Sequence, residues 1–153
     1  MMQDDIRHYL GANDAVRIQI AADGDGSPEI AWGDTFFYVL DKQGEPRKMP
    51  FATIVTKDYP GFDTESQLDR GGLWRLNIEV GKEKFERLFG FWPKALDEHH
   101  GEFDFAAVDK VFPHPLYGAH GWASIINPSA QSRDAVATLL DFASTRASNR
   151  VAV

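Results

Sequence analysis

The chain has 153 residues, of which 43% are hydrophobic and 12% aromatic, enough to build a complete core in one domain. It contains no cysteine, which excludes disulfides and cysteine-ligated zinc. The formal charge is −7, and the sequence has no cluster of lysine and arginine that could bind phosphate groups, so we expect no nucleic-acid partner.

Features of membrane and secreted proteins are missing from the sequence. The start, residues 1–5, is acidic and unlike a signal peptide. No apolar run approaches the roughly 20 residues that a membrane-spanning helix needs. We therefore expect a cytoplasmic protein without a membrane partner.

The pattern of apolar residues in the first 40 residues predicts one helix and two strands. Ile6, Tyr9 and Leu10 share one helical face, with Gly11 as the expected C-cap. Apolar residues alternate with polar ones over 16–20, which is typical of a half-buried strand. A second strand is predicted over 29–40, interrupted near Gly33.

The second half predicts strands over 51–56, 73–80 and 121–127, and helices that end at Gly90 and span 132–146. In the strand over 73–80, apolar side chains face one way, whereas Arg75, Asn77 and Glu79 face the other. Residues 91–110 carry no readable pattern. We predict a single α+β domain over residues 1–153, with a mainly antiparallel sheet of about five strands and about three helices.

Two groups of histidines are candidates for chemistry. His99 and His100 stand among acidic residues, but they lack the spacing of a known zinc site, so a solvated loop is expected and no metal is predicted. His114 and His120 flank a tight turn, so that their side chains could converge. Either is a candidate acid–base or ligand-binding group, and the alternative is a histidine that closes the loop through a hydrogen bond to a neighbouring carbonyl.

Charged residues at predicted strand ends form a second candidate set. Asp34 lies in an otherwise apolar segment, and Lys57 and Asp58 end the strand over 51–56. One reading is a polar pocket in which Lys57, Arg70 or Arg75 meets an anionic ligand. The other is an internal ion pair of Asp34 with Lys57 or Arg75 that fixes strand register.

Several functional motifs are absent. The sequence has no phosphate-binding loop and no nucleophile elbow, and the acidic turn over 23–27 does not match a calcium loop. No cofactor is predicted. The four tryptophans are expected in the core rather than around a cavity.

Long strings of the sequence resemble a bacterial family known as domain of unknown function 6194. The strings are PEIAWGDTFFY over 28–38, PFATIVTKDYPGFD over 50–63, LDR over 68–70, RLNI over 75–78, and HPLY over 114–117 followed by GW at 121–122. The resemblance covers residues 4–146 and implies no activity.

The order of elements also resembles MmcQ/YjbR-like proteins, which implies a compact α+β fold. That group is sometimes labelled DNA-binding. The acidic charge and the long segment over 91–110 depart from it, so the DNA label is not transferred.

These patterns favour a non-enzymatic module that binds a small molecule or a protein, with Asp34, Lys57, Asp58, Arg75, His114 and His120 as candidate site residues. The alternative is a small enzyme in which His114 or His120 acts as acid or base with Asp34 or Asp58. A third hypothesis is a homodimer, in place of a monomer, through exposed aromatic residues over 89–92.

Overall fold

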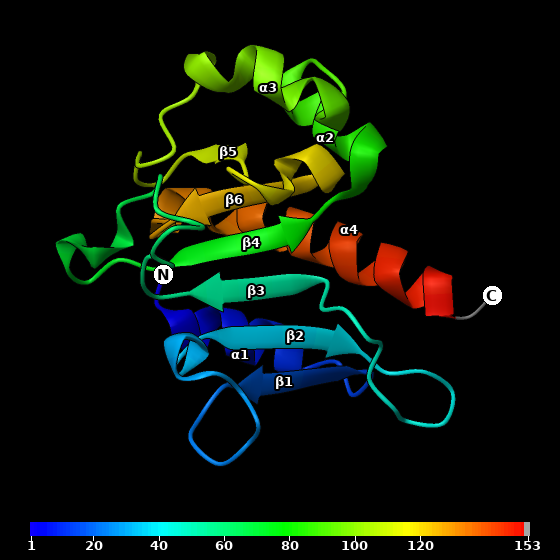
Figure 1. The fold of residues 1–153 in the computed structure, drawn as a ribbon. Helices are drawn as coiled ribbons and strands as arrows, with labels where there is room; N and C mark the ends of the chain where they lie inside the picture. The colour runs from blue at the N-terminus through cyan, green and yellow to red at the C-terminus, as the bar shows by residue number, and fades with distance from the viewer. Residues whose placement is uncertain (152–153) are drawn as a thin grey trace.

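The computed structural model, which describes residues 1–151, contains one six-stranded antiparallel sheet with helices on one face and at one end (Figure 1). The strand order is β1-β2-β3-β4-β6-β5. The strands are β1 (Val16–Ile20), β2 (Thr35–Val39), β3 (Ala52–Val55), β4 (Arg75–Glu79), β5 (Val111–Pro113) and β6 (Trp122–Ile126). The predicted α+β class is confirmed.

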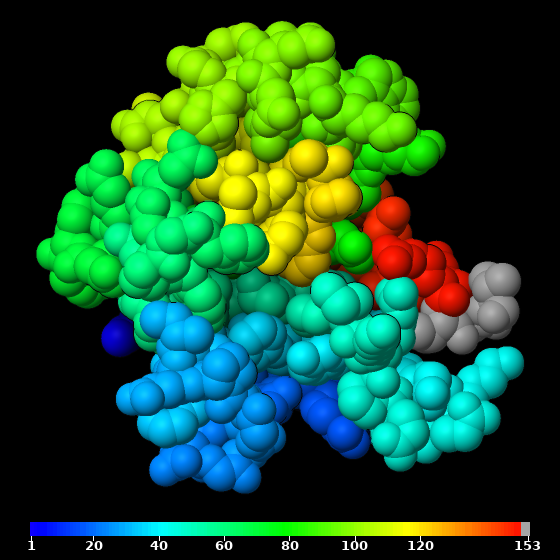
Figure 2. Space-filling model, in the orientation of Figure 1, coloured from blue at the N-terminus to red at the C-terminus, as the bar shows by residue number. Residues whose placement is uncertain are grey.

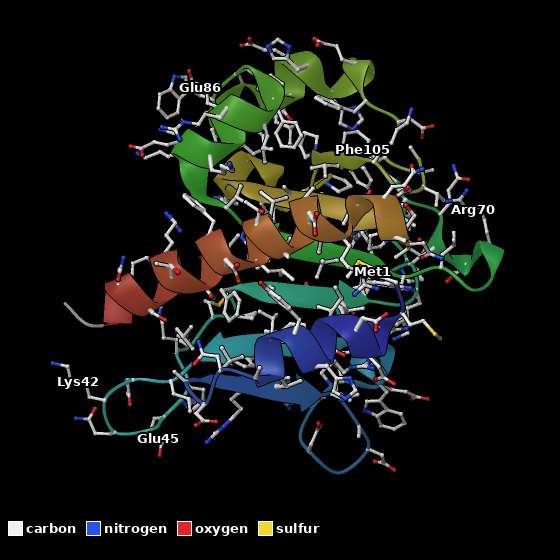
Figure 3. All side chains as sticks on the ribbon, turned by 180° about the vertical axis from the view of Figure 1, so that it is seen from behind. Met1, Lys42, Glu45, Arg70, Glu86 and Phe105 are labelled. Carbon is white, nitrogen blue, oxygen red and sulfur yellow. The ribbon has the colours of Figure 1, made fainter. Side chains whose placement is uncertain are left out.

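Four α-helices accompany the sheet: α1 (Gln3–Gly11), α2 (Gly81–Phe89), α3 (Leu96–His99) and α4 (Arg133–Val151). Seen from behind, α1 and α4 cross the same face of the sheet (Figure 3). Helices α2 and α3 lie at the edge of the sheet formed by β6 and β5 (Figure 1). No helix within residues 1–151 is both long and apolar enough to cross a bilayer.

The core lies between the sheet and helices α1 and α4. Every second side chain along β2, β3, β4 and β6 points into this core. The alternation of apolar residues in the sequence therefore gives the sheet one buried face. Fully buried members include Ile6, Phe37, Ile54, Leu76, Ile78, Ile125 and Leu140. Each such side chain stabilises the fold by about 1.5–3 kcal/mol relative to exposure.

The predicted strand over 29–40 is too long. Glu29–Ala31 form a 3-10 turn, and only Thr35–Val39 pair as β2. Pro28 precedes the turn in an extended conformation, and Gly33 has φ of 92°, a value that favours glycine. The chain therefore bends before it joins the sheet.

Strand β5 is missing from the predicted elements. It has three residues, one of them Pro113, and pairs only with β6 at the edge of the sheet. An edge strand tolerates proline because one row of its backbone groups has no partner. One of the two predicted helix caps is correct: Gly90 caps α2 with φ of 84°. The other is wrong by one residue, because Gly11 belongs to α1 and Ala12 caps it.

Candidate functional site

The sheet face opposite α1 and α4 carries a cavity of about 390 Å³. The loop after β3 and the 3-10 turn Tyr117–His120 border it (Figure 2). Side chains from β2, β3, β4 and β6 form its floor, and loop residues form its walls. The residues that line it are Phe36, Tyr38, Lys48, Met49, Pro50, Thr53, Val55, Tyr59, Phe62, Asp63, Arg75, Asn77, His114, Tyr117 and Trp122.

A buried ion pair lies at the floor of the cavity. Asp63 accepts two hydrogen bonds from Arg75, one from Nη1 at 3.1 Å and one from Nη2 at 2.5 Å. Arg75 also donates to Ser66 Oγ at 2.9 Å and to Asn77 Oδ1 at 2.8 Å, and its Nη2 lies 3.1 Å from His114 Nε2. Arg75 is fully buried, and oxygen acceptors within the protein engage four of its five N–H groups, while the fifth, on Nη2, faces His114 Nε2.

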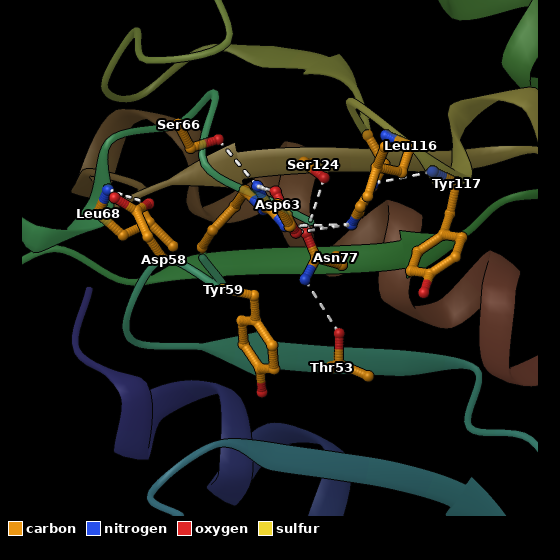
Figure 4. A network of polar contacts seen from close by, with 12 residues as sticks. Thr53, Asp58, Tyr59, Asp63, Ser66, Leu68, Asn77, Leu116, Tyr117 and Ser124 are labelled. Atoms are coloured by element: carbon orange, nitrogen blue, oxygen red, sulfur yellow. Dashed lines mark hydrogen bonds and ion pairs between the residues drawn. The ribbon is translucent and has the colours of Figure 1, made fainter. Parts of the chain in front are cut away.

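Asn77 extends this network across three strands. It lies opposite Thr53 on β3 and Ser124 on β6 in the register of the sheet. Asn77 donates to Thr53 Oγ1 at 3.0 Å and accepts from Ser124 Oγ at 2.8 Å. Figure 4 shows Asn77 linked to both neighbours, with Asp63 over the same strand. The polar floor is therefore held in one arrangement by the sheet itself.

His114 is positioned by its own turn. Its Nδ1 accepts hydrogen bonds from the backbone N–H groups of Leu116 at 3.0 Å and Tyr117 at 2.9 Å. Its Nε2 lies 3.8 Å from Asp63 Oδ2, beyond hydrogen-bonding distance. Burial and, second, the Arg75 cation lower the pKa of His114 well below its usual value, so the ring is neutral at physiological pH.

Asp34 forms a second buried network beside the cavity. Its Oδ1 accepts from Lys57 Nζ and from both the N–H and the hydroxyl of Thr56, each at 3.0 Å. The Tyr59 hydroxyl donates to its other oxygen. Burial and, second, the Asp34 carboxylate raise the pKa of Tyr59, which stays uncharged. Of the two predicted partners of Asp34, the structure places Lys57 beside it.

Asp58 and Arg70 hold the loop after β3 and do not line the cavity. Asp58 accepts a hydrogen bond from the Leu68 N–H at 2.8 Å, and its own N–H donates to Asp69 at 3.1 Å. Arg70 donates to three backbone carbonyls, one of them on Ala106 at 2.9 Å. These contacts fix the loop that carries Asp63.

His120 lies away from His114. It borders a separate hollow of about 500 Å³, together with Lys82, Trp92, Pro93, Lys94, Ala119 and Arg146. The two histidines therefore do not converge on one cavity. Of the six candidate residues, Arg75 and His114 line the sheet-face cavity, while Asp34 and Lys57 reach it through Tyr59.

His99 and His100 lie against glutamate side chains at the surface. His99 Nδ1 lies 2.6 Å from Glu102, and His100 Nε2 lies 2.7 Å from Glu65. Within residues 1–151, no group of three or more histidine or acidic side chains is arranged to hold a metal ion.

Three important site residues were not among the candidates. Asp63 and Tyr59 lie in a loop whose polar residues look alike in the sequence. Asn77 carried a readable signal, because it alternates with Arg75 on the polar side of its strand. Trp122 borders the cavity and Trp92 is 52% exposed, so the expectation that the tryptophans belong to the core holds for Trp74 alone among these three.

The neutral state of His114 predicts a pH dependence. Below pH 6.5 the unfolded chain binds a proton that the folded ring does not, so the free energy of unfolding should fall by up to about 1.4 kcal/mol per pH unit. Denaturant titrations between pH 6.5 and 5 measure it. In His114→Asn the part of this fall in stability that is due to His114 should vanish. If the variant and the wild-type protein showed the same dependence of unfolding free energy on pH, the prediction would be contradicted.

Comparison with known proteins places the chain in a family. No curated protein matches it significantly, and neither does any solved structure. The likeness to MmcQ/YjbR-like proteins is thus not shown and stays a prediction. A family model described as "Family of unknown function (DUF6194)" matches residues 1–153. The chain belongs to the DUF6194 family, whose function is unknown.

Proposed function

We propose that this protein binds a small, partly apolar molecule in the cavity on the open face of its sheet. The observation that carries the proposal is a concave space of about 390 Å³ with aromatic walls over a fixed polar floor. Pockets for small molecules are typically about 300–1,000 Å³, mostly apolar, with a few well-placed polar groups.

The walls offer aromatic surface to a ligand. Phe36 and Tyr38 stand on the same side of β2 and are only half-buried, although the opposite side of this strand is in the core. Across the cavity, Tyr117 is 43% exposed and its ring lies 6.2 Å from that of Phe62. Exposed aromatic side chains that face one cavity favour a flat apolar ligand.

The geometry favours binding over acid–base catalysis by His114. The lone pair of Nδ1 is engaged by two backbone N–H groups, so the neutral ring has no free acceptor with which to take a proton from a substrate. Within residues 1–151, the hollow that His120 borders is lined by no aspartate or glutamate. The concave shape of the cavity also favours a small molecule over a protein partner.

The third hypothesis, a dimer through residues 89–92, has less support. Phe89 and Phe91 pack against the core, which leaves Trp92 as the exposed aromatic residue of that segment.

The test is a titration with 2-methylnaphthalene, an apolar probe that fits the cavity, followed by amide chemical shifts in NMR. Saturable shifts are expected around Phe36, Thr53 and Tyr117. Phe36→Gln should weaken binding about tenfold by removing apolar contact. The control Ile30→Gln changes an exposed residue outside the cavity and should have no effect. Equal affinity in both variants, or no saturable shift, would overturn the proposal.

A further inference from the structure

Hydrogen-bond donors approach both ring nitrogens of His114. The backbone N–H groups of Leu116 and Tyr117 point at Nδ1, and Arg75 Nη2 lies 3.1 Å from Nε2. A neutral imidazole has one acceptor nitrogen and one N–H. Because two backbone donors converge on Nδ1, that nitrogen is the acceptor, and the proton is on Nε2.

Two donors therefore face each other at the floor of the cavity, His114 Nε2–H and an N–H of Arg75. The closest carboxylate oxygen, Asp63 Oδ2, is 3.8 Å from Nε2 and already accepts from Arg75. His114 is 2% exposed and Arg75 fully buried, and a buried donor without an acceptor costs about 1–3 kcal/mol. An acceptor atom supplied from the cavity would engage both donors.

The charge of the floor determines what kind of acceptor fits. The positive charge of Arg75 is balanced by Asp63, and His114 and Tyr59 are uncharged. A carboxylate bound against His114 would place a second negative charge near Asp63. The other cation that lines the cavity, Lys48, is exposed on the loop before β3 and is not buried at the floor. A charge buried at the floor without a balancing cation is unfavourable. An uncharged oxygen has no such cost.

We propose that the polar end of the ligand is an uncharged carbonyl oxygen that accepts hydrogen bonds from His114 Nε2–H and Arg75. This rests on the proposed function of the cavity and names the chemical class of its ligand: an aromatic ketone or amide rather than an acid.

Three probes of nearly equal shape test it: 2-acetylnaphthalene, 2-isopropenylnaphthalene, which lacks the oxygen, and 2-naphthoate, which carries a charge. The ketone should bind at least tenfold more tightly than either of the others, as measured by NMR titration.

His114→Asn and His114→Gln form a matched pair of variants. The asparagine oxygen can take the place of Nδ1 and accept from Leu116 and Tyr117, so the turn stays closed while the Nε2–H donor is lost. In His114→Asn the affinity of the ketone relative to the alkene should fall sharply, because the Nε2–H donor is lost and only the Arg75 donor remains. His114→Gln offers an amide donor near the position of Nε2 and should retain part of the advantage.

The outcomes separate the two proposals. Equal binding of ketone and alkene, or tightest binding of the naphthoate, would overturn the carbonyl assignment and leave the cavity as a binding site. Failure of every probe to bind would overturn both. Long-range ¹H–¹⁵N correlations provide an independent reading, because a proton on Nδ1 of His114 would overturn the assignment without any ligand.

Discussion

Asp63→Asn should lower the free energy of unfolding by about 3–5 kcal/mol, the cost of leaving a buried cation without its partner. Arg75 is fully buried and depends on Asp63 for its only balancing charge at hydrogen-bonding distance within residues 1–151. The amide keeps the shape of the side chain but not its charge. Chemical denaturation at pH 7 measures the effect.

Two further variants make this prediction specific. Asp97→Asn removes an exposed carboxylate on α3 and should change stability by less than about 0.5 kcal/mol. Adding Arg75→Met to Asp63→Asn removes the unbalanced cation and should recover part of the loss. A loss below about 1 kcal/mol in Asp63→Asn would mean that the ion pair is not buried as described.

Asp34→Ala is expected to cost about 3 kcal/mol, because it leaves the Tyr59 hydroxyl and two donors of Thr56 without their acceptor. Asp34 itself is fully buried. Lys57 contributes less to the loss, since its side chain is 26% exposed and can reach water.

Asp34→Asn is the matched comparison, because its amide oxygen still accepts from part of this set. It should therefore be less destabilising than Asp34→Ala. Removal of the carboxylate also removes one cause of the raised pKa of Tyr59, so ultraviolet titration should show this phenol ionising at a lower pH in both variants. Equal stabilities, with an unshifted phenol, would count against the network.

Local patterns predicted most of the fold. Alternation places Leu76 and Ile78 in the core and Arg75 and Asn77 on the opposite face, as the structure has them. The same rule failed where the chain bends, because nothing in the apolar segment before Gly33 distinguishes a 3-10 turn from a strand. Strand β5 was missed because its stability comes from pairing with β6, which is a tertiary contact.

The candidate site was predicted in part. Arg75 and His114 were identified because a charged residue in a strand and a histidine between two prolines are locally unusual. Their partner Asp63 was not, since it approaches Arg75 through a loop whose path depends on contacts with Leu68 and Ala106. Long-range geometry of this kind leaves no periodic signal.

The order in which the strands follow one another bears on how the chain folds during synthesis. Strands β1 to β4 form a meander in which each strand pairs with the next in sequence, so this part can assemble while later residues are still being made. Helix α4, which covers β2 and β4, follows all six strands in the sequence. Until it leaves the ribosome, the apolar side of the nascent meander lacks that cover, and the chain should then be most dependent on chaperones.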